Sequence, residues 1–298
     1  MADRHILIIG CGYIGERVAR AWQARGARVA ALARSEAAEQ RLRSLSIEPF
    51  AGDLDLPETL AMLPIADAVV YYLAPPSAQG QIDARMRGFV HALGALPPPA
   101  RVVLISTTGV YGDCGGAWID EDTPVNPQTP RARRRLDAER VLREAGRSAA
   151  IPVVVLRVPG IYGPGRLPLA RLRERQALPH EAECPFTNRI HADDLTEVCV
   201  AAADRGGADR VYNVSDGHPS TMVDYFNKVA DGVGLPRPPT LPMAEVARVM
   251  SPGMLSYMAE SRRVGNARML RELGVRLRYP GLESGLAASV AQQGSLGD

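Results

Sequence analysis

The chain has 298 residues, which is long enough to bury a full hydrophobic core and to form one large domain or two unequal ones. Its formal net charge is +2, so the overall charge gives no reason to expect binding to nucleic acid or to an anionic membrane. The four cysteines lie far apart and form no Cys-x-x-Cys pair, which argues against a metal site and against a disulfide framework.

No stretch of the sequence has the length and apolar composition of a signal peptide or a membrane span. The unbroken apolar run near the N-terminus covers only Ile6–Ile9. Reduced cysteines fit a reducing compartment best. We therefore expect a soluble, cytoplasmic protein with no membrane partner and no bound metal.

The first residues predict a strand, a glycine turn and a helix. The apolar run Ile6–Ile9 leads into a Gly-x-Gly-x-x-Gly motif, and apolar residues then recur at helical spacing as far as Trp22. In this context Gly10 would allow a tight turn, Gly12 the approach of a pyrophosphate, and Gly15 close packing of helix on strand. The phosphates would be bound by the N–H groups at the helix N-terminus. The predicted phosphate-binding residues are Gly10, Cys11, Gly12, Tyr13, Ile14 and Gly15.

A second buried strand is predicted over Arg28–Ala33, which completes a βαβ unit with parallel strands. In dinucleotide-binding folds a carboxylate about twenty residues past the glycines binds the ribose 2′-hydroxyl of NAD, whereas an arginine suits the 2′-phosphate of NADP. This strand ends in Arg34 and Ser35, with no acid before Glu36. We therefore predict NADP, bound by Arg34 and Ser35, with NAD as the alternative cofactor; a solvated Arg34 at a strand end is the simpler explanation of the same residue.

The next strands predict further contacts to the cofactor. A turn is expected at Asp53, whose carboxylate could accept a hydrogen bond from the adenine amino group or could simply cap the turn. A fourth strand is predicted over Asp67–Ala74, and a Pro-Pro pair ends it. Ligands bind at the carboxyl ends of parallel strands in open α/β sheets. The cofactor is therefore expected to contact Leu73, Ala74 and Pro75.

A helix is predicted over residues 79–94 and a fifth strand over Arg101–Ser106. This strand leads into the segment Thr107–Gly112, where three hydroxyl groups could orient a substrate oxygen beside the cofactor. Residues 113–130 then show no periodicity. A loop of that length in a compact domain is usually functional or mobile.

Residues 131–146 predict a helix that is rich in arginine. Arg135, Glu139 and Arg143 are spaced to form ion pairs along it. Its cluster of arginines between 131 and 135 raises the question of nucleic-acid binding, but a charge run with intervening acids is usually a solvated helix face. We therefore expect no nucleic-acid partner.

The pattern changes after a sixth strand, predicted over Ile151–Arg157. Asp194 has capping-box spacing to Glu197, which predicts that a helix starts there. Short helical patterns follow around residues 221–231, 243–250 and 265–273. We therefore predict an α/β fold with a doubly wound parallel sheet in residues 1–165, completed by a strand near 211–214, and a smaller, interwoven α-rich domain in residues 166–298 that covers the substrate.

Four segments together resemble the NAD-dependent epimerase/dehydratase family, the extended short-chain dehydrogenases/reductases. They are Gly10–Gly15, Ser106–Gly112, Leu156–Gly165 and Asn188–Asp194. The resemblance implies a Rossmann-type fold, an NADP or NAD cofactor, a small sugar-like or anionic substrate, and a homodimer as one option. The opening motif is similar to an atypical branch, because extended members usually space their glycines Gly-x-x-Gly-x-x-Gly.

The resemblance also assigns candidate catalytic residues. Thr107 matches the family's catalytic serine or threonine, but Arg131 stands where its tyrosine is expected and Arg135 where its lysine is expected. Arginine does not deprotonate in proteins, so Arg131 could polarise an oxygen but not transfer a proton. Arg135 could hold the nicotinamide ribose or an anionic substrate. The candidates for the proton donor are Tyr111, Asp113 and Tyr162.

Two functions are consistent with these residues. The first is an NADP-dependent oxidoreductase or epimerase of the short-chain dehydrogenase type, in which Thr107 orients a substrate oxygen and Arg131 and Arg135 stabilise negative charge on it. The second is a non-catalytic module that binds NADP(H) and reports redox state to a partner. The replacement of the family's tyrosine is the reason to consider the second.

Overall fold

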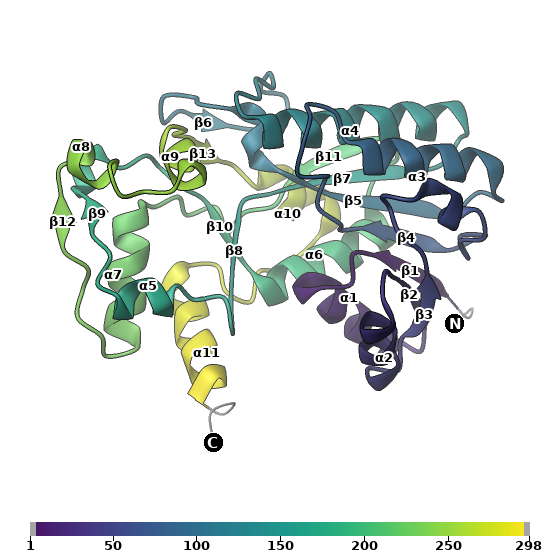
Figure 1. Cartoon of the computed structure of the whole chain (residues 1–298), viewed down its shortest axis with the longest axis horizontal. Coiled ribbons are helices and arrows are strands. Elements are labelled where there is room, and N and C mark those ends of the chain that lie inside the picture. The colour runs from purple at the N-terminus through teal and green to yellow at the C-terminus, as the bar shows by residue number, and fades with distance from the viewer. Residues whose placement is uncertain (1–3, 295–298) are drawn as a thin grey trace.

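The computed structural model describes residues 4–294 of the chain and contains a seven-stranded sheet (Figure 1). The strand order is β11-β7-β5-β4-β1-β2-β3, and every neighbouring pair is parallel. The order winds outward from β1 in both directions, which confirms the predicted doubly wound, Rossmann-type sheet. The strands are β1 (His5–Ile9), β2 (Arg28–Ala33), β3 (Glu48–Ala51), β4 (Val69–Tyr72), β5 (Arg101–Thr107), β7 (Val153–Val158) and β11 (Arg210–Asn213).

Helices cover both faces of the sheet because alternate strand residues point in opposite directions. Ile6 and Ile8 pack into one core with residues of α1 and α6, whereas Leu7 and Ile9 pack into a second core with residues of α3 and α4. Figure 1 shows α3 and α4 on one side of the sheet and α1, α2 and α6 on the other. These helices are α1 (Tyr13–Gln23), α2 (Glu36–Ser44), α3 (Ala84–Ala95), α4 (Pro130–Ser148) and α6 (Ala192–Arg205), and α10 (Ala267–Leu273) packs against α6.

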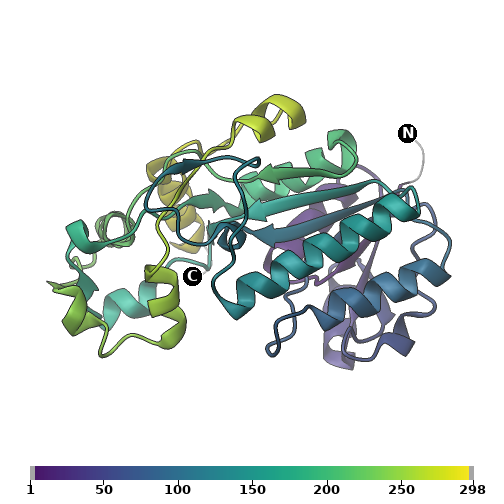
Figure 2. The same cartoon turned by 90° about the horizontal axis from the view of Figure 1, so that it is seen from above.

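A second lobe lies beyond the carboxyl ends of the strands (Figure 2). Its own core includes Leu178, Phe226 and Leu286. It contains α5 (Leu169–Arg173), α7 (Met222–Gly232), α8 (Met243–Val246), α9 (Pro252–Met258), α11 (Leu282–Gly294) and the short strands β8 (Gly160–Tyr162), β9 (Leu178–Pro179), β10 (Arg189–His191) and β12 (Thr240–Leu241). Because α6, α10 and β11 return to the sheet, the chain passes between the two parts more than once. No helix within residues 4–294 is both long enough and apolar enough to cross a bilayer.

Two predicted helix starts are wrong. The helix expected from residue 79 begins at Ala84, after Asp83 caps it by accepting from the N–H of Met86. α6 begins at Ala192 rather than at Asp194, because the ring of His191 is the cap and accepts from the N–H of Asp193. The Asp194 carboxylate instead accepts from two N–H groups near residue 278, which joins α6 to the chain before α11.

The long loop between Thr108 and α4 is tied to the second lobe. Within it, β6 (Trp118–Ile119) pairs with β13 (Arg263–Val264). Asp113 accepts from the N–H of Ser261, and Cys114 donates its N–H to the Ser261 carbonyl. The loop therefore spans the gap between the sheet and the residues that follow α9.

A buried ion pair holds α4 against the sheet. Arg157 of β7 donates to the fully buried carboxylate of Glu139, at 2.8 Å from Nη2 to Oε2. Ser106 of β5 donates to the same carboxylate, and Nη1 of Arg157 donates to the Tyr111 hydroxyl at 2.9 Å. The predicted ion pairs along α4 are therefore wrong: Glu139 turns into the protein, and Arg143 pairs with Asp209.

We predict that Glu139→Gln and Arg157→Met each lower the free energy of unfolding by about 3–5 kcal/mol, because each leaves a buried charge without its partner. The double variant Glu139→Gln/Arg157→Met should lose less than the sum of the two single losses, since it leaves neither charge behind. Chemical denaturation of the four proteins measures these differences.

The exposed pair Arg43–Glu39 on α2 provides the matched control. Glu39→Gln should change the free energy of unfolding by no more than about 0.5 kcal/mol. Similar losses from Glu39→Gln and Glu139→Gln would contradict a structural role for the buried pair.

Candidate functional site

A cavity of about 570 Å³ lies along the glycine motif at the carboxyl ends of β1, β2 and β4. Ten of the twelve predicted cofactor residues line it: Gly10, Cys11, Gly12, Tyr13, Ile14, Gly15, Arg34, Ser35, Leu73 and Pro75. Further lining residues, which the sequence analysis missed, are Leu32, Ala38, Arg41, Leu42, Ile105, Ile161 and Arg166. We call this space the dinucleotide cavity.

The three glycines of the motif meet different constraints. Gly10 has φ of +96°, and a Cβ there would lie 2.5 Å from the backbone nitrogen of Ala74. A Cβ at Gly15 would lie 2.8 Å from the Gly10 carbonyl oxygen, so this glycine lets α1 pack closely on the turn. A Cβ at Gly12 would meet no atom within 4 Å and would only project into open space. The fold needs Gly10 and Gly15, whereas Gly12 leaves room for a ligand.

The start of α1 fits a bound phosphate. Gly12 is its N-cap, and no side chain within residues 4–294 caps this helix. The first N–H groups of a helix lack partners within it and attract negative charge. Next to them the ring of Tyr13 lies between the guanidinium groups of Arg17 and Arg166, at 3.9 and 4.6 Å from its centre. A pyrophosphate therefore suits this cradle of N–H groups and positive charge.

The other end of the dinucleotide cavity is basic. Arg34 is exposed and forms no hydrogen bond or ion pair with any described residue, whereas Arg41 donates to the carbonyl of Cys11 at 2.7 Å and pairs with Glu16. The Ser35 hydroxyl accepts from the N–H of Ala38 and caps α2. It can still donate its own proton to a phosphate oxygen.

Two predicted cofactor residues lie outside the lining of this cavity. The Asp53 carboxylate accepts from the N–H of Asp55, so it caps its turn, as the simpler alternative held. Ala74 is buried: its nitrogen faces Gly10 and its carbonyl accepts from Arg135. Ala74 therefore shapes the cavity wall from behind rather than facing the space itself.

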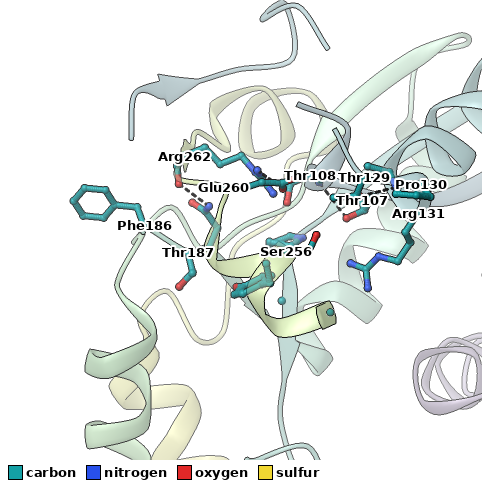
Figure 3. A pocket seen from close by; sticks show the side chains of 17 residues that line it. Thr107, Thr108, Thr129, Pro130, Arg131, Phe186, Thr187, Ser256, Glu260 and Arg262 are labelled. Atoms are coloured by element: carbon teal, nitrogen blue, oxygen red, sulfur yellow. Dashed lines mark hydrogen bonds and ion pairs between the residues drawn. The ribbon is translucent and has the colours of Figure 1, made fainter. Parts of the chain in front are cut away.

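A second cavity, of about 340 Å³, lies between the carboxyl end of β5 and the second lobe (Figure 3). Thr107, Thr129 and Arg131 lie on one side of it, and Phe186 and Thr187 on the other. Tyr257, Glu260 and Arg262 from the second lobe also line it. We call this space the substrate cavity.

Thr107 and Arg131 are brought together as predicted. Both line the substrate cavity, and Thr107 caps the 3-10 turn over Thr108–Tyr111 by accepting from the N–H of Gly109 at 3.2 Å. Arg131 lies in the first turn of α4, and its side chain forms no hydrogen bond or ion pair with the rest of residues 4–294. A free guanidinium beside a hydroxyl can bind an electron-rich oxygen.

Arg135, in contrast, lines neither cavity. Its guanidinium is largely buried and donates to the carbonyl of Ala74 at 3.1 Å. Burial lowers the pKa of Arg135, although the nearby Asp83 carboxylate and Tyr72 phenol act to raise it. Arg135 therefore holds the loop after β4, and no contact with a ribose or a substrate is assigned to it.

The three expected proton donors also lie outside the substrate cavity. The Tyr111 hydroxyl is buried, donates to Asn213 at 2.8 Å and accepts from Arg157, and burial raises its pKa. Asp113 accepts N–H groups in its turn and at Ser261. Tyr162 is buried beneath α11. The structure therefore places none of the three in the wall of the substrate cavity.

The arginines of α4 are not one solvated face. The side chain of Arg134 is buried and donates to the Gly80 carbonyl, and Arg133 donates to Gln81 and to the Pro127 carbonyl. With Arg135 they hold the loop that precedes α3. The prediction of a solvated face is therefore wrong for the buried Arg134, whereas Arg131 and Arg133 are exposed as that prediction requires.

The profile of the NAD dependent epimerase/dehydratase family matches residues 6–215. The chain belongs to this family. The matched residues include the glycine motif, the strands β5 and β7, which lead to the substrate cavity, and the start of α6. The family is named for its dependence on NAD, which agrees with a nicotinamide dinucleotide in the dinucleotide cavity.

Several similar proteins align with most of the length of this chain. It is 28% identical over 307 residues to 3-diazoavenalumate denitrifying reductase of a Streptomyces species, covering 94% of this chain and 98% of that one. It is 27% identical to 4-hydroxy-2-methyl-3-oxo-4-farnesyl-3,4-dihydroquinoline-1-oxide ketoreductase of Stigmatella aurantiaca, covering 76% and 72%. The solved structure of a functionally unknown conserved protein from Silicibacter pomeroyi DSS is 30% identical, with a TM-score of 0.80 and coverage of 97% and 99%.

The glycine motif provides a test that separates folding from ligand binding. Gly12→Ala should change the free energy of unfolding by no more than about 0.5 kcal/mol, since its Cβ meets no protein atom. It should weaken NADPH binding at least about tenfold, because the methyl group occupies the space of the pyrophosphate. Chemical denaturation and calorimetric titration measure the two effects.

Gly10→Ala is the matched comparison, and we expect it to destabilise the fold by about 1–3 kcal/mol through its positive φ and its contact with Ala74. Wild-type affinity for NADPH in Gly12→Ala would show that no pyrophosphate approaches this glycine.

Proposed function

We propose that this protein is an NADP-dependent oxidoreductase that reduces a carbonyl group of a small molecule, or oxidises the corresponding alcohol. The observation that carries the proposal is the junction of the two cavities. Within β5 and its end, Ile105 lines the dinucleotide cavity and Thr107 the substrate cavity. At β8 the neighbours Ile161 and Gly160 divide in the same way. A ligand in each space would place reacting groups side by side.

The proposed preference for NADP rests on Arg34. It lines the dinucleotide cavity at the end of β2, where a family member specific for NAD would present a carboxylate to the ribose. Arg41 lines the same cavity but already bonds to Cys11 and pairs with Glu16. Arg34 therefore supplies the free guanidinium for a 2′-phosphate, with Ser35 as a second donor.

The proposed reduction assigns one task to each residue of the substrate cavity. A reduced nicotinamide, when bound, supplies the hydride that adds to the carbonyl carbon. Thr107 orients the carbonyl oxygen, and Arg131 stabilises the negative charge that develops on it. Tyr257 donates the proton to that oxygen and regains one from solvent, since more than a third of its surface is exposed. A phenol from α9 would thus replace the missing tyrosine of α4.

The activities for which two relatives are named support a reductase over an epimerase. One is a denitrifying reductase that aligns along nearly the full length of this chain, and the other is a ketoreductase. We also propose that Arg131 and Arg135 of α4 stand where other members of the family carry the catalytic tyrosine and lysine.

The cofactor preference can be tested at Arg34. We expect Arg34→Asp to weaken NADPH binding by about 30-fold or more, because it removes a charge-assisted hydrogen bond to the 2′-phosphate and adds repulsion. NADH binding should change less than about threefold. Fluorescence titration with both cofactors measures this, and equal losses for NADPH and NADH would place Arg34 away from the phosphate.

The catalytic roles predict which variants lose turnover. In NADPH oxidation with a panel of aldehydes and ketones, Arg131→Met should lower kcat/KM by about 10²–10³ and Tyr257→Phe should lower kcat by about 10²–10⁴. Both variants should bind NADPH as the wild type does, since neither residue lines the dinucleotide cavity. Arg140→Met, an exposed change on the same helix, is the control and should keep full activity.

Tight NADPH binding by the wild type without turnover of any panel compound would favour the alternative, a non-catalytic NADP(H)-binding module. Full activity in Tyr257→Phe would remove that phenol as the proton donor without affecting the reductase assignment.

A further inference from the structure

One arginine in the wall of the dinucleotide cavity comes from the second lobe. Arg166 lies in the turn between β8 and α5, whereas Arg34 and Arg41 come from the end of β2 and from α2. The Arg166 side chain is exposed, and it forms no hydrogen bond or ion pair with any described residue. Its guanidinium carbon lies 4.6 Å from the centre of the Tyr13 ring. An arginine in a cavity wall that no carboxylate neutralises is available to an anionic ligand.

The turn that carries Arg166 is fixed against the glycine motif. The Tyr13 hydroxyl donates to the carbonyl of Pro164 at 2.9 Å. The N–H of Arg166 closes the turn by donating to the Gly163 carbonyl at 3.0 Å. A Cβ at Gly163, which has φ of +151°, would lie 2.7 Å from the Tyr13 hydroxyl oxygen. A glycine is therefore needed for this close approach, and Tyr13 holds the turn beside the start of α1.

A second arginine stacks on the same ring but has other partners. Cζ of Arg17 lies 3.9 Å from the centre of the Tyr13 ring. Arg17 also donates to the Tyr13 carbonyl at 3.0 Å and pairs with Asp193 at 3.5 Å. It does not line the dinucleotide cavity. Of these two arginines, only Arg166 is both free of other partners and part of the cavity wall.

The charge at this end of the cavity favours a contact between Arg166 and the pyrophosphate. A dinucleotide carries a negative charge on each phosphate, whereas the N-terminus of a helix is equivalent to only about half a positive charge. None of the described residues that line the cavity is acidic. Arg34 lies at the other end, where the ribose 2′-phosphate is expected. Arg166 is thus placed to supply the remaining positive charge beside Gly12 and Tyr13.

We infer that Arg166 is a cofactor-binding residue whose guanidinium binds the pyrophosphate from the second lobe, together with the N–H groups at the start of α1. Tyr13 acts as a positioning residue, because its hydroxyl holds the turn. The inference rests on the proposed function only in that a dinucleotide occupies the cavity, and it holds for NADP and NAD alike. Bound cofactor would then join the second lobe to the sheet, and so stabilise the arrangement in which the substrate cavity is formed.

Ligands that differ in the pyrophosphate test this inference. NADPH and ADP-ribose contain the group, whereas adenosine 2′-phosphate does not. Arg166→Met should weaken the binding of NADPH and ADP-ribose by about 10- to 100-fold, because it removes a charge-assisted contact. Adenosine 2′-phosphate should keep its wild-type affinity. Arg34→Asp should give the opposite pattern, with loss of adenosine 2′-phosphate and retention of ADP-ribose. Calorimetric or NMR titration measures all three ligands.

Three further variants separate a phosphate contact from a packing role. Arg17→Met is the matched control, since it removes the other guanidinium on Tyr13 and should leave ADP-ribose affinity unchanged. Arg166→Lys keeps the charge without the planar fork and should recover part of the affinity. Tyr13→Phe should weaken ADP-ribose binding in the wild type but cause no further loss in Arg166→Met, because it acts through the turn. Unchanged thermal midpoints without ligand verify that the variants are folded.

Wild-type affinity for ADP-ribose in Arg166→Met, an equal loss for adenosine 2′-phosphate, or an equal loss in Arg17→Met would overturn the inference. None of these results would affect the reductase assignment, which turnover of the carbonyl panel decides. A loss confined to the pyrophosphate ligands, in a protein that reduces no panel compound, would retain Arg166 and overturn the reductase. Failure of the wild type to bind NADPH, NADH or ADP-ribose would overturn both.

Discussion

The ion pair between Glu139 and Arg157 fixes the relative positions of the elements that build the site. It joins α4 to β7, and through Ser106 and Tyr111 it also reaches the end of β5 and the turn that follows. Thr107 comes directly after Ser106, and Arg131 lies about two turns before Glu139 on α4. In a buried network of this kind each charged group stays in place beside its partner, because a buried charge without a partner would destabilise the fold. The backbone positions of Thr107 and Arg131 therefore depend on one interior contact.

The two arginines of α4 have different consequences for the chemistry of the family. Arg135 has turned into the protein and holds the loop behind Gly10, so it supports the cofactor wall without facing it. Arg131 keeps its side chain in the substrate cavity, where it offers charge but no transferable proton. On the proposed function, the proton donor lies on α9 of the second lobe. Catalysis would then require that lobe to be in place over the sheet, whereas a tyrosine on α4 would not.

The sequence predicted best those features that depend on neighbours in the chain. The glycine motif, its flanking strand and helix, and ten of the residues that line the dinucleotide cavity follow from local order. Asp53 and Ala74 were predicted but do not line that cavity, and seven residues that do line it were missed. The substrate cavity was predicted only on the side of Thr107 and Arg131. Tyr257 and Glu260 were missed because their segment has no periodicity and reaches the cavity through the pairing of β13 with β6, more than 140 residues earlier. Glu139 was misassigned for a related reason: its spacing suggested partners on its own helix, and only the packed sheet supplies Arg157.

The polar groups that the fold leaves unpaired mark where chemistry can occur. Arg34 and Arg131 lack partners in the described chain, each at one of the two cavities, while most charged side chains around them are paired. An exposed ion pair stabilises a protein by no more than about 1 kcal/mol, so leaving an exposed arginine free costs the fold little. The same guanidinium bound to an anionic oxygen in a space that excludes water gains far more, because the effective dielectric constant is lower there.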